Sequence, residues 1–99
     1  AKSESGGWFN ECTDAEILRA QKLLAETEGI FCEPASGASV AGVLKDLELG
    51  VIGEGTTIVC TLTGHGLKDP DTAIAQSTRP VVVDATRAAI ERVIGENLP

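Results

Sequence analysis

The chain has 99 residues, 42% hydrophobic and only 3% aromatic, so it holds at most one small domain with a core of aliphatic side chains. Its formal net charge of -7 argues against a nucleic-acid partner and against an anionic membrane surface, because both bind clustered Lys and Arg. No apolar run approaches the roughly 20 residues that a helix needs to cross a bilayer.

The beginning of the chain suggests a piece of a longer protein. Methionine is absent throughout, including at position 1, and no signal peptide opens the sequence. We therefore expect a segment of a cytoplasmic protein. Trp8 and Phe9, which follow a Gly-Gly pair, form either a short strand or a packing pair at a domain edge.

A capping box predicts the first long helix. The Thr13 hydroxyl can accept a hydrogen bond from the third helical N–H, and Glu16 can reach back to the start of the helix. We expect this helix to run to about Glu28, where Gly29 ends it in a left-handed conformation.

A strand, a helix and a second strand follow. Residues 30–32 are apolar, and Pro34 stops this strand because it has no N–H to give to a sheet. Ser36 or Ser39 can cap the next helix, and Gly50 ends it. The apolar residues of this helix recur at i, i+3, i+4 and i+7, and they are Val40, Val43, Leu44 and Leu47.

The second strand is expected at residues 56–62, because an almost continuous apolar run begins at Ile58, which is typical of a strand buried on both faces of a parallel sheet. The resulting βαβ unit predicts an α/β fold. Both strands would end at one edge of the sheet, so the loops at residues 33–37 and 63–69 should lie side by side there. Ligands of open α/β sheets bind at that edge.

The remaining residues give weaker patterns. Residues 71–76 can form a helical turn, residues 80–83 favour a strand, and Asp84 can cap a last helix. We expect the cysteines to be buried, reduced thiols, and with a single histidine we expect no metal site. These cysteines are Cys12, Cys32 and Cys60.

Several polar residues of the two loops are candidates for function, and each has a structural alternative. Thr63 can cap the turn after its strand, and Glu33 can be a partly solvated side chain before Pro34. His65 either packs in its loop or contacts a substrate. Lys68 and Asp69 either form a local ion pair or fix the turn before Pro70.

The motifs in these loops resemble the C-terminal part of threonine synthases. The segments that carry the resemblance cover roughly residues 3–76, and they are Thr-Asp-Ala-Glu-Ile at 13–17, Glu-Gly-Ile-Phe-Cys-Glu-Pro-Ala-Ser at 28–36, Ser-Val-Ala-Gly at 39–42 and Leu-Thr-Gly-His-Gly-Leu-Lys-Asp-Pro at 62–70. The resemblance implies a three-layer αβα fold with a mainly parallel sheet, like the tryptophan synthase β subunit. Residues 1–99 would be a single C-terminal segment of the domain that binds pyridoxal phosphate.

The resemblance also implies an activity and a site. Such enzymes convert O-phosphohomoserine and water to threonine and phosphate, and the intact enzyme is expected to be a homodimer. It implies that Thr63 bonds the pyridine nitrogen of the cofactor, where a neutral hydroxyl leaves the ring a weaker electron sink than a carboxylate would. Glu33 and Ala35 would lie at the same cofactor pocket. Ser36 would line that pocket or, more simply, cap the helix.

Two parts of such an enzyme are missing from this chain. No lysine stands in the Ser-Phe-Lys-Asp type of motif that carries the Schiff-base lysine, and the Gly-rich loop for the cofactor phosphate is absent. The resemblance therefore implies no catalytic residue here, and the remainder of the protein must supply it. The alternatives are a segment of a sister enzyme, cysteate synthase or threonine dehydratase, or a non-catalytic α/β module that binds a ligand.

Overall fold

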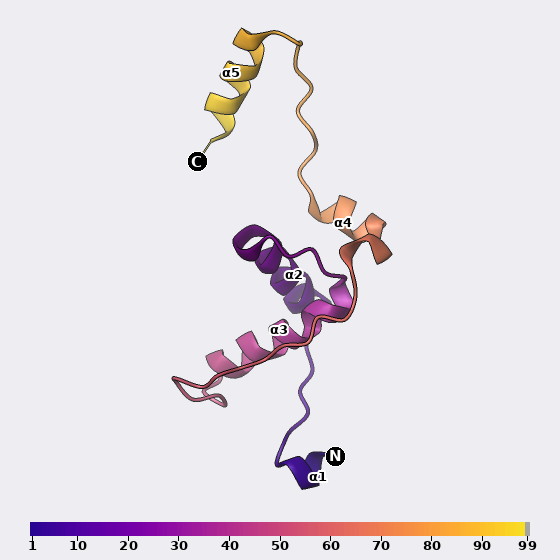
Figure 1. The fold of residues 1–99 in the computed structure, drawn as a ribbon, viewed down its shortest axis with the longest axis vertical. Coiled ribbons are helices and arrows are strands. Elements are labelled where there is room, and N and C mark those ends of the chain that lie inside the picture. The colour runs from indigo at the N-terminus through magenta and orange to yellow at the C-terminus, as the bar shows by residue number, and fades with distance from the viewer. Residues whose placement is uncertain (99) are drawn as a thin grey trace.

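The computed structural model describes residues 1–98 and is elongated. Its radius of gyration is 18.3 Å, whereas a compact domain of this length has about 13 Å. Figure 1 shows two long helices at the centre, with a short helix near each end of the chain. The helices are α1 (Lys2–Ser5), α2 (Asp14–Glu28), α3 (Pro34–Glu48), the 3-10 helix η1 (Gly66–Lys68), α4 (Pro70–Gln76) and α5 (Arg87–Asn97).

The helix signals in the sequence are largely confirmed. Thr13 Oγ1 accepts from the Glu16 N–H at 3.2 Å, and Glu16 Oε2 accepts from the Thr13 N–H at 2.8 Å, so the capping box forms. Gly29 ends α2 with a φ of 66°, a value that favours glycine. The predicted capping by Asp84 is wrong, because Thr86 caps α5.

The predicted strands are not formed within residues 1–98. Cys32 and His65 make an isolated antiparallel bridge, and the segment at 56–62 runs beside α3 without a partner strand (Figure 1). Val59 is 89% exposed there, rather than buried on both faces. The mainly parallel sheet is therefore not confirmed, and residues 80–83 are also irregular and exposed. The physical reason is that a strand needs a neighbour for its N–H and C=O groups.

Helices α2 and α3 pack closely because small residues face each other. Ala20 is fully buried on α2, and Ala41 on α3 is 2% exposed. A Cβ atom at Gly37 would lie 3.4 Å from the carbonyl oxygen of Ile17, which is van der Waals contact, so the two helices approach closely at this crossing. The buried Gln21 side chain donates from Nε2 to the Cys32 carbonyl at 2.7 Å, which fixes the segment that joins the two helices.

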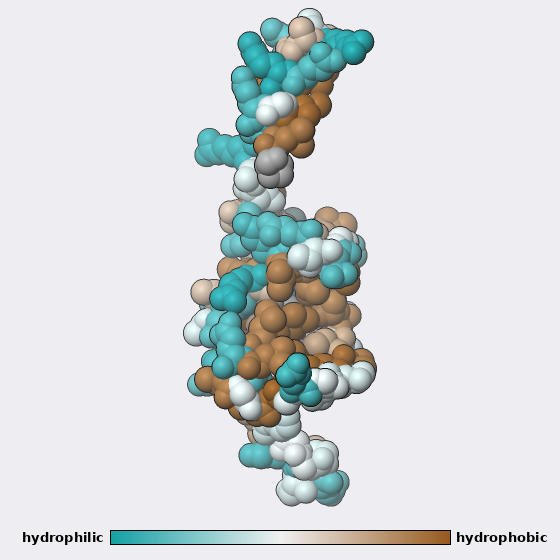
Figure 2. Space-filling view, turned by 90° about the vertical axis from the view of Figure 1, so that its left-hand side faces the viewer, coloured by the Kyte–Doolittle hydropathy of each residue, from teal (hydrophilic) through white to brown (hydrophobic). Residues whose placement is uncertain are grey.

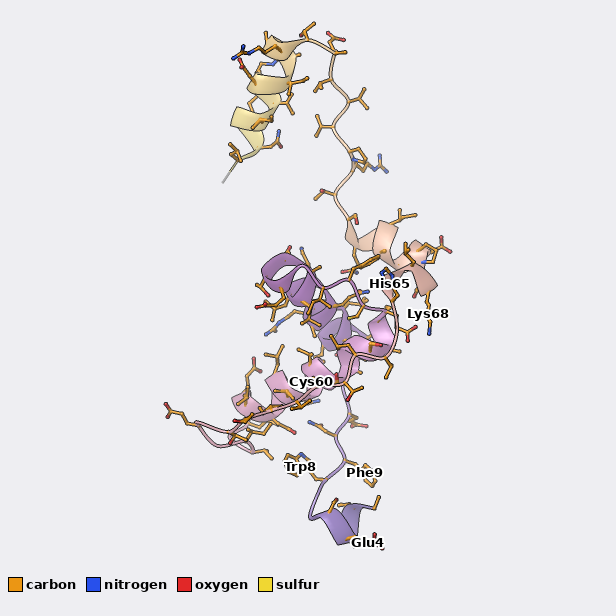
Figure 3. All side chains as sticks on the ribbon, viewed as in Figure 1. Glu4, Trp8, Phe9, Cys60, His65 and Lys68 are labelled. Atoms are coloured by element: carbon orange, nitrogen blue, oxygen red, sulfur yellow. The ribbon has the colours of Figure 1, made fainter. Side chains whose placement is uncertain are left out.

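Asp46 holds the N-terminal segment against α3. Its carboxylate is 7% exposed and accepts from Trp8 Nε1 at 2.9 Å and from Asn10 Nδ2 at 2.7 Å. Trp8 and Phe9 project to opposite sides of the chain (Figure 3), and Phe9 is 82% exposed. The two aromatic residues therefore form neither a strand nor a packing pair.

Apolar side chains also gather on the surface over the middle of the molecule (Figure 2). Ile58, Val59 and Leu67 are among the exposed ones. No helix of residues 1–98 is long and apolar enough to cross a bilayer. Among the same residues, no group of three or more His, Cys, Asp or Glu side chains could hold a metal ion.

Replacing Asp46 by alanine should release the N-terminal segment. Hydrogen bonds to a charged acceptor contribute about 1.5–3 kcal/mol when buried, so we expect a loss of about 1–3 kcal/mol at this partly exposed contact. Trp8 is the only tryptophan, so its fluorescence during a urea titration reports the change. Glu48→Ala removes only the exposed pair with Arg19 and should change little. Equal effects of the two substitutions would contradict this assignment.

The capping box should respond to pH. The Thr13 N–H lowers the pKa of Glu16, desolvation opposes this, and the charge of Lys45 adds to the lowering. A lowered pKa in the folded state means that the contribution is present above the unfolded pKa and is lost as pH falls through the folded value. The NMR shift of the Thr13 amide should follow this titration in the native chain and become insensitive in Glu16→Gln. A Glu16 titration within the usual range of glutamate would contradict the prediction.

Candidate functional site

The two loops singled out in the sequence lie side by side. The Glu33 N–H donates to the Gly64 carbonyl at 3.0 Å, and the Gly66 N–H donates to the Phe31 carbonyl at 3.0 Å. The predicted juxtaposition is therefore confirmed, although the two segments run antiparallel where they touch. The contact brings residues about 30 positions apart in the chain into one cluster.

Both glycines of the Gly-His-Gly turn lie against side chains of the segment that precedes α3. A Cβ atom at Gly64 would overlap the Glu33 side chain, and one at Gly66 would overlap the Phe31 ring. The rings of Phe31 and His65 also meet edge to face, with centroids 5.6 Å apart. The turn is thus packed directly against the segment that precedes α3.

Ser36 is the centre of the contact. It is 3% exposed and lies in the first turn of α3. Its Oγ accepts from the Gly64 N–H at 2.7 Å and from the Thr63 N–H at 3.1 Å. The same oxygen lies 3.2 Å from Thr63 Oγ1 and 3.5 Å from Glu33 Oε1. One hydroxyl therefore holds the main chain and the side chain of the second loop.

The predicted capping role of Ser36 is wrong. Helix α3 begins at Pro34, its N-cap is Glu33, and no side chain caps it. Proline favours the first position of a helix, so Pro34 places Ser36 inside the first turn. Ser39 is likewise inside the helix, where its single hydroxyl hydrogen has two acceptors within reach, the Ser36 carbonyl at 3.1 Å and the Thr61 carbonyl at 3.4 Å.

The structure brings two of the three predicted site residues together. Thr63 is exposed and Glu33 is half-buried, and Ser36 links them. Ala35 is exposed and lines a separate surface cavity of about 370 Å³, whose lining includes neither Thr63 nor Glu33. The other residues that line this cavity are Asp14, Ile17, Leu18, Pro34, Asp69 and Thr72.

The other polar residues of the second loop have local roles. His65 Nδ1 accepts from the Leu67 N–H at 3.1 Å and so caps η1. Asp69 caps α4, with Oδ1 3.2 Å from the Thr72 N atom and Oδ2 2.7 Å from the Thr72 hydroxyl. Within residues 1–98, Lys68 makes no ion pair with Asp69, so the turn-fixing alternative holds for Asp69 and the ion pair does not form.

The three cysteines are reduced, as predicted, but the prediction that all of them are buried is wrong for Cys12 and Cys60. Cys32 is 2% exposed, whereas Cys12 and Cys60 are only half-buried. Burial raises the pKa of the Cys32 thiol, although a hydrogen bond from its own main chain opposes the shift. The thiol of Cys32 is therefore a packing group beneath the loops and a poor nucleophile.

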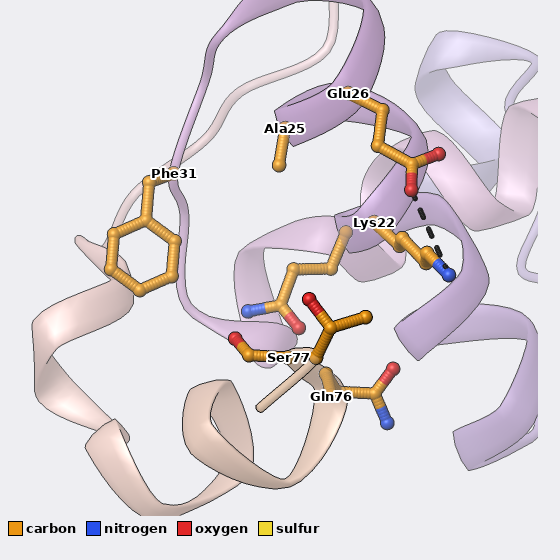
Figure 4. Close-up of a pocket in the computed structure, with 8 residues that line it drawn as sticks. Lys22, Ala25, Glu26, Phe31, Gln76 and Ser77 are labelled. Carbon is orange, nitrogen blue, oxygen red and sulfur yellow. Dashed lines mark ion pairs between the residues drawn. The ribbon is translucent and has the colours of Figure 1, made fainter. Parts of the chain in front are cut away.

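A second surface cavity of about 370 Å³ lies between α2 and the end of α4 (Figure 4). Its cationic residue Lys22 pairs with Glu26 at 3.7 Å. The remaining residues that line it are Gln21, Ala25, Phe31, Gln76, Ser77 and Thr78. Because Glu26 neutralises the charge of Lys22, we expect this cavity to bind anions more weakly than it would if Lys22 were unpaired.

Sequence similarity to known proteins supports the resemblance carried by the motifs. Residues 2–64 match the family of pyridoxal-phosphate dependent enzymes. The threonine synthase of Methanocaldococcus jannaschii is 51% identical over 92 residues, 93% of this chain and 23% of the relative. That of Methanosarcina acetivorans is 56% identical over 91 residues, 92% of this chain and 22% of the relative. That of Mycobacterium leprae is 52% identical over 95 residues, 94% of this chain and 26% of the relative.

The similarity thus extends into the tail beyond residue 76, and the chain spans about a quarter of the length of these curated relatives. The family match covers more than half of the chain and includes the loop that carries Glu33 and Ser36 and the segment that leads to Thr63. The chain belongs to the family of pyridoxal-phosphate-dependent enzymes.

Proposed function

We propose that this chain is a segment of a threonine synthase, which converts O-phosphohomoserine and water to threonine and phosphate. The identity of about half of all aligned positions to three enzymes of that name supports the proposal. In the site, the observation that carries it is the exposed Thr63 hydroxyl held at the meeting of two loops.

Thr63 is proposed to donate a hydrogen bond to the pyridine nitrogen of the cofactor. The residues present fit this role, because the hydroxyl is neutral, exposed and anchored through its own N–H to Ser36. When bound, pyridoxal phosphate supplies an electron sink for bond breaking next to the amino group of the substrate. A hydroxyl beside the ring nitrogen keeps that nitrogen unprotonated, which suits elimination and replacement away from the α carbon.

Glu33 is proposed to line the cofactor pocket beside Thr63, and Ala35 is proposed to reach this pocket in the intact enzyme, since in this structure it lines a separate cavity. Glu33 presents a half-buried carboxylate against Gly64, at the side of the turn that carries Thr63. Ala35 is exposed in the first turn of α3, one residue before Ser36. A small side chain at this place leaves room for a flat aromatic ring.

The remainder of the enzyme is proposed to supply what these residues lack. The phosphate clamp and the lysine that binds the cofactor covalently would come from elsewhere in the longer protein. The same protein would pair its strands with residues 56–62 and cover exposed apolar side chains such as Val59, which restores the parallel sheet of the family. The intact enzyme is further proposed to be a cytoplasmic homodimer.

Thr63→Ala in the full-length enzyme should lower phosphate release from O-phosphohomoserine. Leaving the ring nitrogen without its donor should reduce kcat roughly 5- to 100-fold, since a buried acceptor without a partner costs about 1–3 kcal/mol. The cofactor absorbance should shift as well. Thr63→Ser keeps the hydroxyl and is the matched control, so it should retain most of the rate and the native spectrum. Unchanged kcat and absorbance in the alanine variant would contradict the assignment of Thr63 as the donor to the pyridine nitrogen.

The residues of this chain alone should show no covalent attachment of the cofactor. Within residues 1–98, none of the four lysines forms a hydrogen bond with Thr63 or Ser36, so incubation with pyridoxal phosphate and reduction with borohydride should label no lysine selectively. Mass spectrometry of the peptides measures this. The full-length enzyme is the positive control and should be labelled at one lysine. Selective labelling of the 99-residue chain, or phosphate release by it, would show that the nucleophile lies here.

A further inference from the structure

The Ser36 hydroxyl has an unusual set of partners for a side chain buried in a helix. A serine hydroxyl offers one hydrogen and two lone pairs. The N–H groups of Gly64 and Thr63 lie 2.7 and 3.1 Å from its oxygen, and together they occupy both lone pairs. Ser36 can therefore act toward every other neighbour only as a donor.

Two acceptors lie within reach of that single hydrogen. Thr63 Oγ1 is at 3.2 Å and Glu33 Oε1 is at 3.5 Å, and the longer distance is at the limit for a hydrogen bond. Whichever acceptor takes the hydrogen, Ser36 has no lone pair left to receive the hydrogen of Thr63. The Thr63 hydroxyl must then donate elsewhere.

No other residue within 1–98 accepts a hydrogen bond from Thr63 Oγ1. The side chain is exposed, so its hydrogen is directed out of the cluster, toward whatever occupies the space beyond. If Thr63 faces a ring nitrogen, this arrangement makes it an obligatory donor to that nitrogen.

We propose that Ser36 is a positioning residue that sets the direction of the Thr63 hydroxyl. It immobilises the main chain of residues 63 and 64, donates to Thr63 Oγ1 and leaves the Thr63 hydrogen for an acceptor outside. Such an acceptor must carry a lone pair, which an unprotonated aromatic nitrogen does and a protonated one does not. The identity of the acceptor rests on the proposed function. The direction of the hydrogen bond from the Ser36 hydroxyl to the Thr63 hydroxyl rests on the geometry alone.

The first test needs no cofactor. Amide hydrogen exchange in the apo form of the full-length protein should be at least 10-fold faster at Thr63 and Gly64 in Ser36→Ala, because both N–H groups lose their acceptor. Ser39→Ala is the matched control, since it removes a hydroxyl one turn later that contacts the Thr61 carbonyl and neither of these amides. Circular dichroism checks that both variants keep their helices. Unchanged protection in Ser36→Ala would overturn the proposal.

The second test uses the holoenzyme and a double-mutant cycle. Ser36→Ala should lower kcat with little change in KM and shift the cofactor absorbance in the direction seen for Thr63→Ala. The double variant should be no worse than Thr63→Ala alone, because Ser36 acts through Thr63. Ser36→Thr keeps the hydroxyl and should restore part of the rate and the native spectrum. Additive losses, or no rescue by threonine, would contradict a positioning role.

The outcomes separate this inference from the proposed function. If Thr63→Ala leaves the rate and the spectrum unchanged, the assignment of Thr63 to the cofactor fails. Faster exchange at Thr63 and Gly64 in Ser36→Ala would then still support the anchoring half of the inference. If Thr63→Ala is impaired and Ser36→Ala is not, the assignment of Thr63 stands and the positioning role of Ser36 is overturned.

Discussion

The hydroxyl of Ser36 is the contact on which the candidate site depends. It comes from the first turn of α3 and accepts hydrogen bonds from the N–H groups of Thr63 and Gly64. A long irregular segment separates these two residues from the end of α3. Without it, the second loop would be held to the first by two main-chain hydrogen bonds, at Glu33 and Gly66, and by the ring contact between Phe31 and His65. A buried oxygen that satisfies two main-chain donors is costly to replace, because an apolar side chain in its place leaves both donors without a partner.

The position of that serine follows from the start of the helix. Pro34 occupies the first helical position, where its lack of an N–H costs nothing and its fixed φ is already helical. Ser36, two positions later, therefore lies within the first turn of α3, where its hydroxyl contacts the second loop. Had the helix begun at Ser36, as simple capping preferences suggest, the same hydroxyl would have turned back to the N–H groups of its own helix. The proline therefore helps decide whether Ser36 serves its helix or the site.

Local signals predicted the helices α2 to α5, and the lack of partners for long-range pairing explains why the predicted strands do not form. The capping box at Thr13 and the glycine at 29 depend on neighbours within five residues, so the sequence contains everything needed to place α2. A strand at residues 56–62 depends on partners that can lie anywhere in a protein, and residues 1–98 provide none. The loops still meet as expected, because Gly64 and Gly66 allow main-chain contact with Glu33 and Phe31. The hydrogen bonds from the Thr63 and Gly64 N–H groups to Ser36 could not be predicted from the sequence, because they join two loops that are far apart in the chain.

The cluster also favours a neutral group at position 63 over an acidic one. Glu33 already places a carboxylate oxygen 3.5 Å from the Ser36 hydroxyl. An aspartate at 63 would bring a second carboxylate to the same hydroxyl, which has only one hydrogen to donate. Two carboxylates that share one donor repel each other. A threonine avoids this conflict because it accepts from Ser36 and donates outward. The negative charge of Glu33 in the first loop and the neutral ring nitrogen of the cofactor thus both favour a neutral hydroxyl at position 63 of the second loop.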